Sequence, residues 1–482
     1  MPTLRQDQIE DLGVLLYQKR RHIHGGEPGT GKTPTICVLQ KGIHQLHGFK
    51  SVWLMPMKLI EKNYDEAMLW GQWKPDLLDA RGVPIRGSGG EVAIVDGSPA
   101  RCAAIIADPN VKVLLMGFTR FELVADLIPP EYKAIQIDEW HKGFGGHGSK
   151  RTQALYKWCN RAGKDLFFTP MTGTIYDGKP DTIYPAIQII APTYYGTLEN
   201  FKLWHDILDP FTNRIVAHDN FPRLQQIYSQ HAIRRLFRDI HGDQLVVPEI
   251  ARVAMSKRQR TAYDTFRDQA LLELERFFVD GTQPGVAFIR ARQIMEHPNF
   301  FPNLIDDDNG PSVDITPGEL PGKMELFEQD CRDMQSLGRP MLAYSALIPQ
   351  QRQMVDIAAR AGRRVGLING STSPAEVGRI DREFVAGKLD TIIGSDIVAD
   401  CGYNWQDCGD QEVQDVFFVG LGYKDTTFSQ AYKRAIRRNR KTPLRLKISS
   451  YIDSIDQHIL RLTKHKSVDA ARVEPGREPL PW

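Results

Sequence analysis

Short runs of apolar residues recur along the chain, separated by longer polar stretches of helical character. In the first 200 residues these runs are residues 52–55, 113–116, 134–137 and 166–169. A second series comprises residues 341–344, 365–368, 391–394 and 416–419. A strand that is apolar at every position is buried on both faces, which is typical of a parallel sheet covered by helices. Two such series predict an α/β protein with two parallel-sheet lobes.

The stretch between the two series has a different character. Residues 200–321 read as mainly helical, and the sequence Asp-Asp-Asp-Asn-Gly-Pro at 306–311 predicts an exposed loop. After residue 466 the chain is polar and rich in proline, so we expect a poorly ordered tail. The predicted organisation is a first lobe at 1–199, a helical insertion at 200–321, a second lobe at 322–466 and a tail at 467–482.

Composition narrows the class of protein. The 482 residues are 41% hydrophobic and 25% charged, as in ordinary globular proteins. The six cysteines are scattered without a C-x-x-C pair, which argues against a zinc ribbon and a secreted disulfide framework. No apolar run reaches membrane-spanning length, and the N-terminus lacks a signal-peptide core. We therefore expect a soluble, cytoplasmic protein.

Charge is unevenly distributed along the chain. Residues 424–482 contain 14 lysines and arginines against 6 aspartates and glutamates, although the whole chain has a net charge of only +2. A basic end on a mildly acidic body suits an anionic partner, but a solvated basic tail would have the same composition.

A glycine-rich motif lies near the N-terminus. It consists of Gly26, Glu27, Pro28, Gly29, Thr30, Gly31, Lys32 and Thr33, and it fits G-x-x-x-x-G-K-[ST] at every position. Glycines let main-chain amides surround phosphates, Lys32 supplies positive charge for the β- and γ-phosphates, and the Thr33 hydroxyl is the expected Mg²⁺ ligand. The motif predicts an ATP site.

An acidic pair follows the predicted strand at 134–137. A carboxylate at this strand end can face the phosphate loop, so Asp138 is expected to hold Mg²⁺ and Glu139 to activate the attacking water. Acidic pairs are common on surfaces. The preceding strand and the upstream phosphate loop make this pair informative.

With these motifs in order, the chain resembles a superfamily 2 helicase, and more narrowly the Swi/Snf-type DNA translocases in a compact form like that of bacterial or viral members. The resemblance runs from about Leu4 to Leu460. It implies two RecA-like lobes, ATP with Mg²⁺ as cofactor and DNA as partner.

In the first lobe the resemblance assigns adenine reading to Gln8. It places Lys58 in motif Ia and Thr119 with Arg120 in motif Ib, where the family contacts nucleic-acid backbone. Residues 138–141 correspond to the DExH form of motif II. Motif III, which couples hydrolysis to lobe movement, corresponds to Thr172, Gly173 and Thr174.

The narrower assignment depends on residues 233–236, 247–250, 259–263 and 292–298, which are similar to signatures of the Swi/Snf-type group. Taken singly, Arg234 and Arg235 predict only a solvated basic face. In the second lobe Ser345, Ser371 and Thr372 correspond to family residues that touch phosphates. Motif V departs from the family at Asp400, where glycine is favoured.

The segment from Gln430 to Arg437 resembles motif VI, with Gln430 in a coupling position and Ile436 in place of the usual histidine. Arg434 and Arg437 are three residues apart and would share one face of a helix. From there they could act as arginine fingers on the transferring phosphoryl group. The alternative is a generic basic face.

The sequence thus predicts an ATP-dependent motor, with double-stranded DNA translocation coupled to remodelling, annealing or branch migration as its output. A 3′–5′ unwinding helicase acting on DNA or RNA is the alternative enzyme, with RNA the less expected partner. A nucleotide-gated DNA clamp and a motor subunit of a larger assembly also remain open. We expect a monomer, unless a protein partner completes such an assembly.

Overall fold

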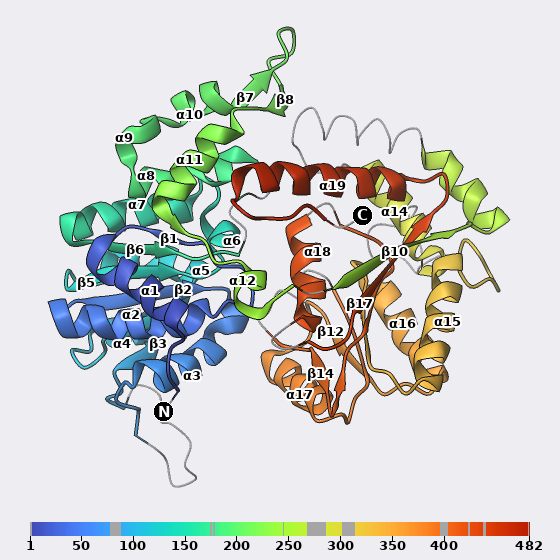
Figure 1. Ribbon diagram of the computed structural model, residues 1–482, viewed down its shortest axis with the longest axis horizontal. Helices are drawn as coiled ribbons and strands as arrows, with labels where there is room; N and C mark the ends of the chain where they lie inside the picture. The colour runs from blue at the N-terminus through green and yellow to red at the C-terminus, as the bar shows by residue number, and fades with distance from the viewer. Residues whose placement is uncertain are drawn as a thin grey trace. The chain divides into compact units, whose positions relative to one another are not determined.

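The structure is a computed structural model that divides into two compact units (Figure 1). It describes residues 2–77, 88–173, 176, 179–243, 245–267, 286–300, 314–395, 403–422, 425–436, 440–480 and 482. Unit 1 comprises residues 1–205, 218–240 and 470–477, and unit 2 comprises residues 206–217, 241–469 and 478–482. Each unit is therefore assembled from three separate stretches of chain.

Unit 1 is built on a parallel five-stranded sheet with the order β3-β4-β2-β5-β6. The strands are β2 (Lys50–Met55), β3 (Val92–Ile94), β4 (Val113–Gly117), β5 (Tyr132–Ile137) and β6 (Phe167–Pro170). All four apolar runs predicted in this half of the chain are strands of this sheet.

Alternate side chains of each strand enter two different cores, which explains why the runs are apolar throughout. Val52 and Leu54 pack into a core formed with α4 (Pro99–Ala107), α5 (Phe118–Val124) and α7 (Lys150–Ala162). Trp53 and Met55 point the other way, into a core formed with helices that include α2 and α3. The sheet is thus covered on both faces.

The remaining helices of unit 1 complete these layers and the region around them. They are α1 (Gln6–Gly13), α2 (Lys32–His47), α3 (Ile60–Gly71), α6 (Trp140–Phe144), α8 (Tyr184–Ile190), α9 (Pro192–Tyr195), α10 (Leu198–His205) and α11 (Phe221–His231). A further helix, α12 (Phe237–His241), ends just past residue 240.

Two very short strands extend the strand order beyond β6. β1 (Ile23–His24) bridges through His24 to Met171, just after β6, and pairs in parallel with β9 (Ala232–Ile233). Arg21, just before β1, bridges to Phe168 in β6. Two residues give no readable pattern, so neither strand could be predicted. Their importance is positional, because β1 leads directly into the glycine-rich motif.

Unit 2 is built on a parallel six-stranded sheet with the order β10-β17-β16-β11-β13-β12. The strands are β10 (Val246–Val253), β11 (Met341–Tyr344), β12 (Val365–Ile368), β13 (Thr391–Gly394), β16 (Asp415–Phe418) and β17 (Leu444–Tyr451). Its helices are α14 (Val286–Glu296), α15 (Gly322–Ser336), α16 (Ile348–Arg360), α17 (Pro374–Val385), α18 (Asp425–Tyr432) and α19 (Ile455–Val473). The second series of apolar runs is confirmed as β11, β12, β13 and β16.

The stretch at 200–321, predicted as a mainly helical insertion or linker, contains strands as well as helices. Its described residues include β9, β10 and a hairpin of β7 (Asp206–Leu208) and β8 (Ile215–His218), and they are divided between both units. β10 pairs with β17 over eight residues as the edge strand of the second sheet. An edge position tolerates Pro248, which a central strand would not.

The C-terminal tail is packed, contrary to the expectation of a poorly ordered segment. α19 continues to Val473, and both Glu474 and Leu480 are buried. The Trp482 ring lies 4.9 Å from the Phe428 ring, centroid to centroid. The polarity of this segment reflects internal hydrogen bonds, such as Leu480 N to Ser467 Oγ at 2.7 Å.

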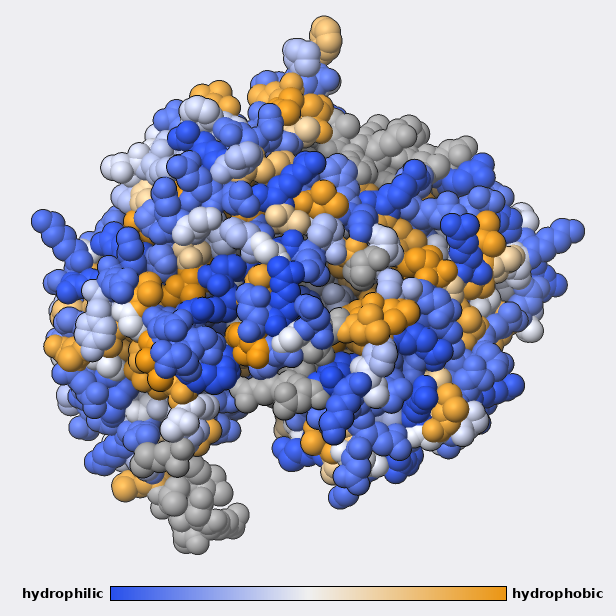
Figure 2. Space-filling view, viewed as in Figure 1, coloured by the Kyte–Doolittle hydropathy of each residue, from blue (hydrophilic) through white to orange (hydrophobic). Residues whose placement is uncertain are grey.

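On the face shown in Figure 2 hydrophilic side chains predominate. Among the exposed large hydrophobic residues is Phe211, which lies in the loop between β7 and β8 and is 95% exposed. Five cysteines, at positions 37, 102, 159, 331 and 408, are buried free thiols. Within the described ranges no helix combines the length and the apolar composition that a bilayer crossing requires.

Candidate functional site

The glycine-rich motif forms a tight loop between β1 and α2 in unit 1. Gly29 and Gly31 have φ angles of 86° and 87°, in the left-handed region that favours glycine. A Cβ atom on Gly26 would lie 2.5 Å from Thr30 Oγ1. These positions require glycine because the main chain itself forms the cradle.

Lys32 lies under this loop, in the first turn of α2. Its ammonium group donates to the carbonyl oxygens of Gly26, at 2.6 Å, and Glu27, at 3.2 Å. Burial lowers the pKa of Lys32, while the negative charges of Glu139 and Asp138 oppose that shift. The two predicted acids therefore act on the predicted lysine, within one site.

α1 supports the loop from another side. Gln8, predicted to read adenine, is buried, and its amide nitrogen donates to Gly31 O at 2.9 Å. Arg5 donates to Thr30 O at 2.5 Å, and its main-chain amide donates to Gln8 Oε1 at 2.9 Å. Gln8 thus contacts the predicted nucleotide loop directly.

Asp138 and Glu139 follow the last residue of β5. The Asp138 amide continues the β2–β5 ladder by donating to Leu54 O at 2.8 Å. Burial raises the pKa of Asp138 to about 6; the charge of Glu139 adds to this rise and Lys32 opposes it. Glu139 has a φ of 49°, a conformation that costs a residue other than glycine about 1 kcal/mol.

Motif III is joined to both the acidic pair and the loop. Thr172 Oγ1 and His141 Nδ1 are hydrogen-bonded at 2.9 Å, and His141 Nδ1 lies 3.7 Å from Glu139 Oε2. A Cβ atom on Gly173 would lie 2.8 Å from Pro28 Cδ, so motif III packs directly on the glycine-rich loop. Thr174, the third predicted coupling residue, lies outside the described residues.

The predicted backbone contacts of unit 1 lie at the same ends of neighbouring strands. Lys58 follows β2, and Thr119 and Arg120 follow β4, its partner in the sheet. Thr119 is exposed, whereas Lys58 and Arg120 are half-buried. A Cβ atom on Gly117 would lie 2.4 Å from Met57 Sδ, so the two predicted motifs touch.

Arg234 belongs to this site although its sequence predicted only a solvated face. Its side chain donates to Gly25 O at 2.7 Å and to Gly173 O at 3.4 Å. Its guanidinium also lies 3.7 Å from Glu27 Oε1 and 3.5 Å from Glu474 Oε2. No spacing rule reveals this role, since the partners come from three distant parts of the chain.

His24 and Tyr228 pack against the start of the loop. Burial lowers the pKa of His24 to about 3, so its contact with Asp11 at 3.6 Å joins a neutral imidazole to a carboxylate and is not an ion pair. A Cβ atom on Gly25 would lie 2.0 Å from Tyr228 Oη. Gly25 therefore needs to be glycine as much as the motif glycines do.

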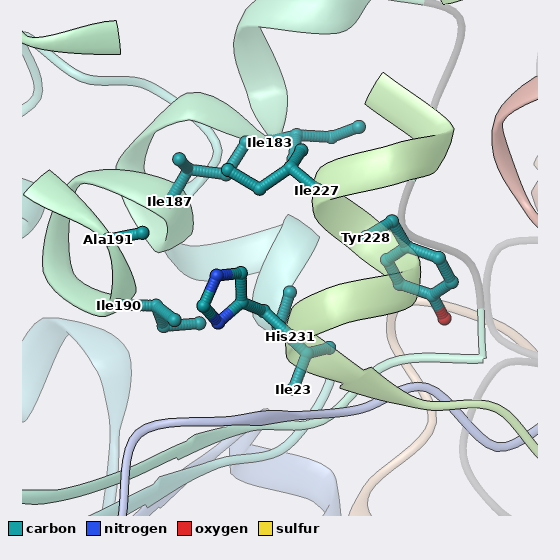
Figure 3. Close-up of a pocket in the computed structure, with 8 residues that line it drawn as sticks. All are labelled: Ile23, Ile183, Ile187, Ile190, Ala191, Ile227, Tyr228 and His231. Carbon is teal, nitrogen blue, oxygen red and sulfur yellow. The ribbon is translucent and has the colours of Figure 1, made fainter. Parts of the chain in front are cut away.

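Tyr228 also borders a small apolar pocket between α8, α11 and β1 (Figure 3). Isoleucines dominate its lining, and the Tyr228 hydroxyl points away from them. The lining residues are Ile23, Ile183, Ile187, Ile190, Ala191, Ile227, Tyr228 and His231. With so few polar groups this pocket does not suit a nucleotide, and it forms part of the packing behind β1.

In unit 2 the predicted phosphate contacts follow β11 and β12. Ser345 is buried, and its hydroxyl bonds to Gln350 Oε1, so it is engaged within the protein. Ser371 is exposed and Thr372 is half-buried. Both hydroxyls bond to Asn369 Oδ1, at 2.7 Å for Ser371 and 3.4 Å for Thr372.

The motif VI segment is not one continuous α-helix. α18 ends at Tyr432, and residues 433–435 form a 3₁₀ turn. Gln430 and Arg434 are buried, and Arg434 donates to Tyr403 O at 3.4 Å. The prediction of one helix face shared by Arg434 and Arg437 is wrong at Arg434, because the α-helix has ended. Arg437 and Asp400 lie outside the described residues.

Many basic side chains of the C-terminal region have partners inside the protein. Lys447 lies 2.7 Å from Asp330, and Arg445 lies 2.5 Å from Asp415. Arg440 donates to Val413 O at 2.6 Å, and Arg477 lies 3.0 Å from Glu474. The net charge of this region therefore overstates what is available to an anionic partner.

The chemistry of unit 1 fits a magnesium nucleotide. The glycine cradle leaves no room for a Cβ atom, the ammonium group of the half-buried Lys32 lies beneath it, and the half-buried Asp138, whose pKa is raised, lies at an adjacent strand end. A divalent cation would favour the ionised form of Asp138, and Thr33 in the first turn of α2 offers a hydroxyl.

No protein-family model matches the sequence, and no curated protein matches it either. The solved structures that resemble this chain include two that are each 14% identical to it in sequence. One is the Pyrococcus furiosus Hef helicase domain. The match covers 95% of this chain and 99% of the Hef chain, at a TM-score of 0.52. The other is the Sulfolobus solfataricus SWI2/SNF2 ATPase core in complex with dsDNA. That match covers 99% of this chain and 94% of the Sulfolobus chain, at a TM-score of 0.42. The likeness to the Hef helicase domain shows the fold, which has two RecA-like α/β lobes.

Proposed function

We propose that this chain, with its helicase-core fold, is an ATP-driven motor that moves along DNA. Its output would be translocation on double-stranded DNA, coupled to remodelling, annealing or branch migration. The narrower Swi/Snf-type assignment comes from the order of the sequence motifs.

One observation carries the proposal. In unit 1 a glycine cradle, a half-buried lysine and an Asp-Glu pair are connected to motif III by the hydrogen bond between His141 and Thr172. A phosphate site that served only binding would not need this connection. A motor needs it, because hydrolysis must be coupled to movement.

The residues of unit 1 divide the chemistry among them. Lys32 and the loop amides would hold the phosphates, and Glu139 would orient and deprotonate the attacking water. Bound Mg²⁺ would neutralise phosphate charge, with Thr33 and Asp138 as its protein ligands. The bond from Thr172 to His141, next to Glu139, would let motif III respond to the state of the water-activating residue.

For unit 2 we propose that Arg437 supplies positive charge to the transferring phosphoryl group, with Arg434 supporting that segment from its buried position. Lys58, Thr119, Arg120, Ser371 and Thr372 would contact DNA phosphates, with little dependence on base sequence. Ser345, engaged with Gln350, would act by shaping the start of its loop.

ATP turnover with different nucleic acids tests the proposal. Hydrolysis would be measured without cofactor and with single-stranded DNA, duplex DNA, forked DNA and RNA, for the wild type and for Lys32→Ala. We expect stimulation chiefly by duplex or forked DNA and no turnover by the variant. A rate that ignores all nucleic acids would indicate a nucleotide-gated clamp instead.

Translocation and strand separation require a second assay. Triplex displacement on an intact duplex reports translocation, while strand displacement on forked DNA reports unwinding. Triplex displacement alone would support the proposal. Efficient strand displacement would favour the 3′–5′ unwinding helicase.

A further inference from the structure

The C-terminal segment returns to unit 1 and contacts Arg234, which belongs to the candidate nucleotide site. Residues 470–477 belong to unit 1, although most of α19 belongs to unit 2. Ala470 and Val473 are fully buried in an apolar core with Tyr184, Phe221 and Tyr228. This packing fixes the position of the residue that follows, Glu474.

Glu474 is fully buried, and its carboxylate lies among polar groups. Its Oε1 accepts from the Tyr176 amide at 3.0 Å and from Arg477 at 3.0 Å. Its Oε2 lies 3.5 Å from Arg234. A buried carboxylate in such a setting is stable only while its cationic partners remain in place.

Arg234 extends this cluster into the site. Its guanidinium bonds the carbonyl oxygens of Gly25, at the start of the glycine-rich loop, and Gly173, in motif III. The Arg234 side chain therefore ties the loop to motif III. Glu474 contacts Arg234 and also accepts a hydrogen bond from the amide of Tyr176, two residues after motif III.

We propose that Glu474 is a positioning residue for ATP hydrolysis: through Arg234 and the Tyr176 amide it fixes motif III against the glycine-rich loop. This inference rests on the proposed ATPase. The C-terminal segment would thereby control turnover without touching the nucleotide.

The contacts predict which kinetic constant changes. The loop keeps other supports when Glu474 is altered, namely Gln8, Arg5 and its own internal bonds. Nucleotide binding should therefore persist. Motif III loses a larger part of its anchoring, so the catalytic step should slow.

The first test compares Glu474→Gln with the wild type in DNA-stimulated ATP turnover. We expect kcat to fall about tenfold while KM for ATP stays within about threefold, the signature of an interaction needed after binding. Counting active sites with a fluorescent ATP analogue separates this loss from a misfolded fraction. Turnover within about twofold of the wild type would overturn the proposal.

Asp456→Asn is the matched control. Asp456 is a buried carboxylate in unit 2 that pairs with Lys323 at 2.7 Å, far along the chain from motif III. Its loss should lower the melting temperature without the selective fall in kcat. An equal fall in kcat would show that general destabilisation explains the effect of Glu474→Gln.

A double variant tests whether Glu474 acts through Arg234. If it does, Arg234→Gln combined with Glu474→Gln should reduce kcat by less than the product of the two single losses, because the two variants share the Arg234 contact and differ only in the contact of Glu474 with the Tyr176 amide. Losses that multiply would show two independent effects and would refute this route.

Amide hydrogen exchange decides the proposal even if the chain proves not to hydrolyse ATP. Glu474→Ala should accelerate exchange in peptides that contain Tyr176 and in those that cover residues 25–31, and leave peptides from β11–β13 unchanged. Unchanged exchange at 25–31 would refute the inference. Absent wild-type turnover together with the expected exchange would refute only the proposed ATPase.

Discussion

At the scale of single residues, burial opposes the two charges that the candidate site needs. It lowers the pKa of Lys32 and raises the pKa of Asp138, and each group partly restores the charge of the other. A site that holds such charges without a ligand is destabilised by them, and a magnesium nucleotide would relieve that cost.

The raised pKa of Asp138 predicts how stability and activity respond to pH. Protonation of Asp138 stabilises the folded state at low pH, and this contribution is lost as the pH rises through about 6. Asp138→Asn should therefore raise the melting temperature at pH 7.5, with a smaller gain at pH 5, and should abolish turnover. Thermal denaturation at both pH values measures this.

Asp126→Asn, which alters an exposed carboxylate of the same unit, should leave the melting temperature nearly unchanged. If Asp138→Asn lowered the melting temperature at pH 7.5, the electrostatic interpretation would be wrong. In the wild type, kcat/KM for ATP should fall as the pH drops below about 6, because the metal ligand is then protonated.

Thr172→Val tests the hydrogen bond between motif III and the acidic pair. The substitution conserves shape and removes the hydroxyl that bonds His141, so we expect DNA-stimulated turnover to fall about tenfold with little change in nucleotide affinity. Tyr156→Phe removes a tyrosine–histidine bond of the same length, 2.9 Å, between Tyr156 and His147 elsewhere in unit 1. Equal losses in both variants would contradict a specific role for Thr172.

At the scale of elements, the strands that are buried on both faces were readable from the sequence. Residues 341–344, 365–368 and 391–394 are strands with the predicted bounds, because an uninterrupted apolar run has few other uses in a parallel sheet. β10 and β17 were missed for the opposite reason. In β10, an edge strand, Pro248, Glu249 and Arg252 interrupt the apolar residues, and in β17 apolar and polar residues alternate from Leu444 to Ile448.

The candidate site, like the fold, was predictable only where a local sequence pattern marks the residues. Lys32, Asp138 and Glu139 follow from a local motif and a strand end, and the structure brings them into one site. The roles of Arg234 and Glu474 could not be predicted, because they come from contacts between distant segments that no local spacing encodes. The polar tail was misjudged for the same reason.

Leu446→Ala tests the contribution of β17 to unit 2. Leu446 is fully buried between β10 and β16, so we expect a loss of about 2–5 kcal/mol in the free energy of unfolding, measured by chemical denaturation. Val247→Ala, in β10 and 46% exposed, is the control and should cost under about 1 kcal/mol. A loss at Leu446 as small as that of the control would show that β17 contributes little.

At the scale of the whole molecule, the proposed motor requires residues from both units in one catalytic cycle. Lys32→Ala and Arg437→Ala should each abolish turnover, because the proposed chemistry needs the phosphate cradle and the second-lobe arginine together. Their circular dichroism spectra should match that of the wild type, which would show that the fold is retained. Normal ATPase activity in either variant would contradict the two-lobed mechanism.

The assembly of unit 1 from three stretches of chain has a practical consequence. A gene truncated after residue 240 encodes most of unit 1 but omits residues 470–477, which supply Glu474 and buried apolar side chains. Such a fragment would expose the apolar surface beside Tyr228 and Phe221, and Arg234 would lose its contact with the Glu474 carboxylate. Anyone wishing to study this lobe in isolation should therefore graft the missing carboxy-terminal piece back through a designed linker, or add it as a synthetic peptide.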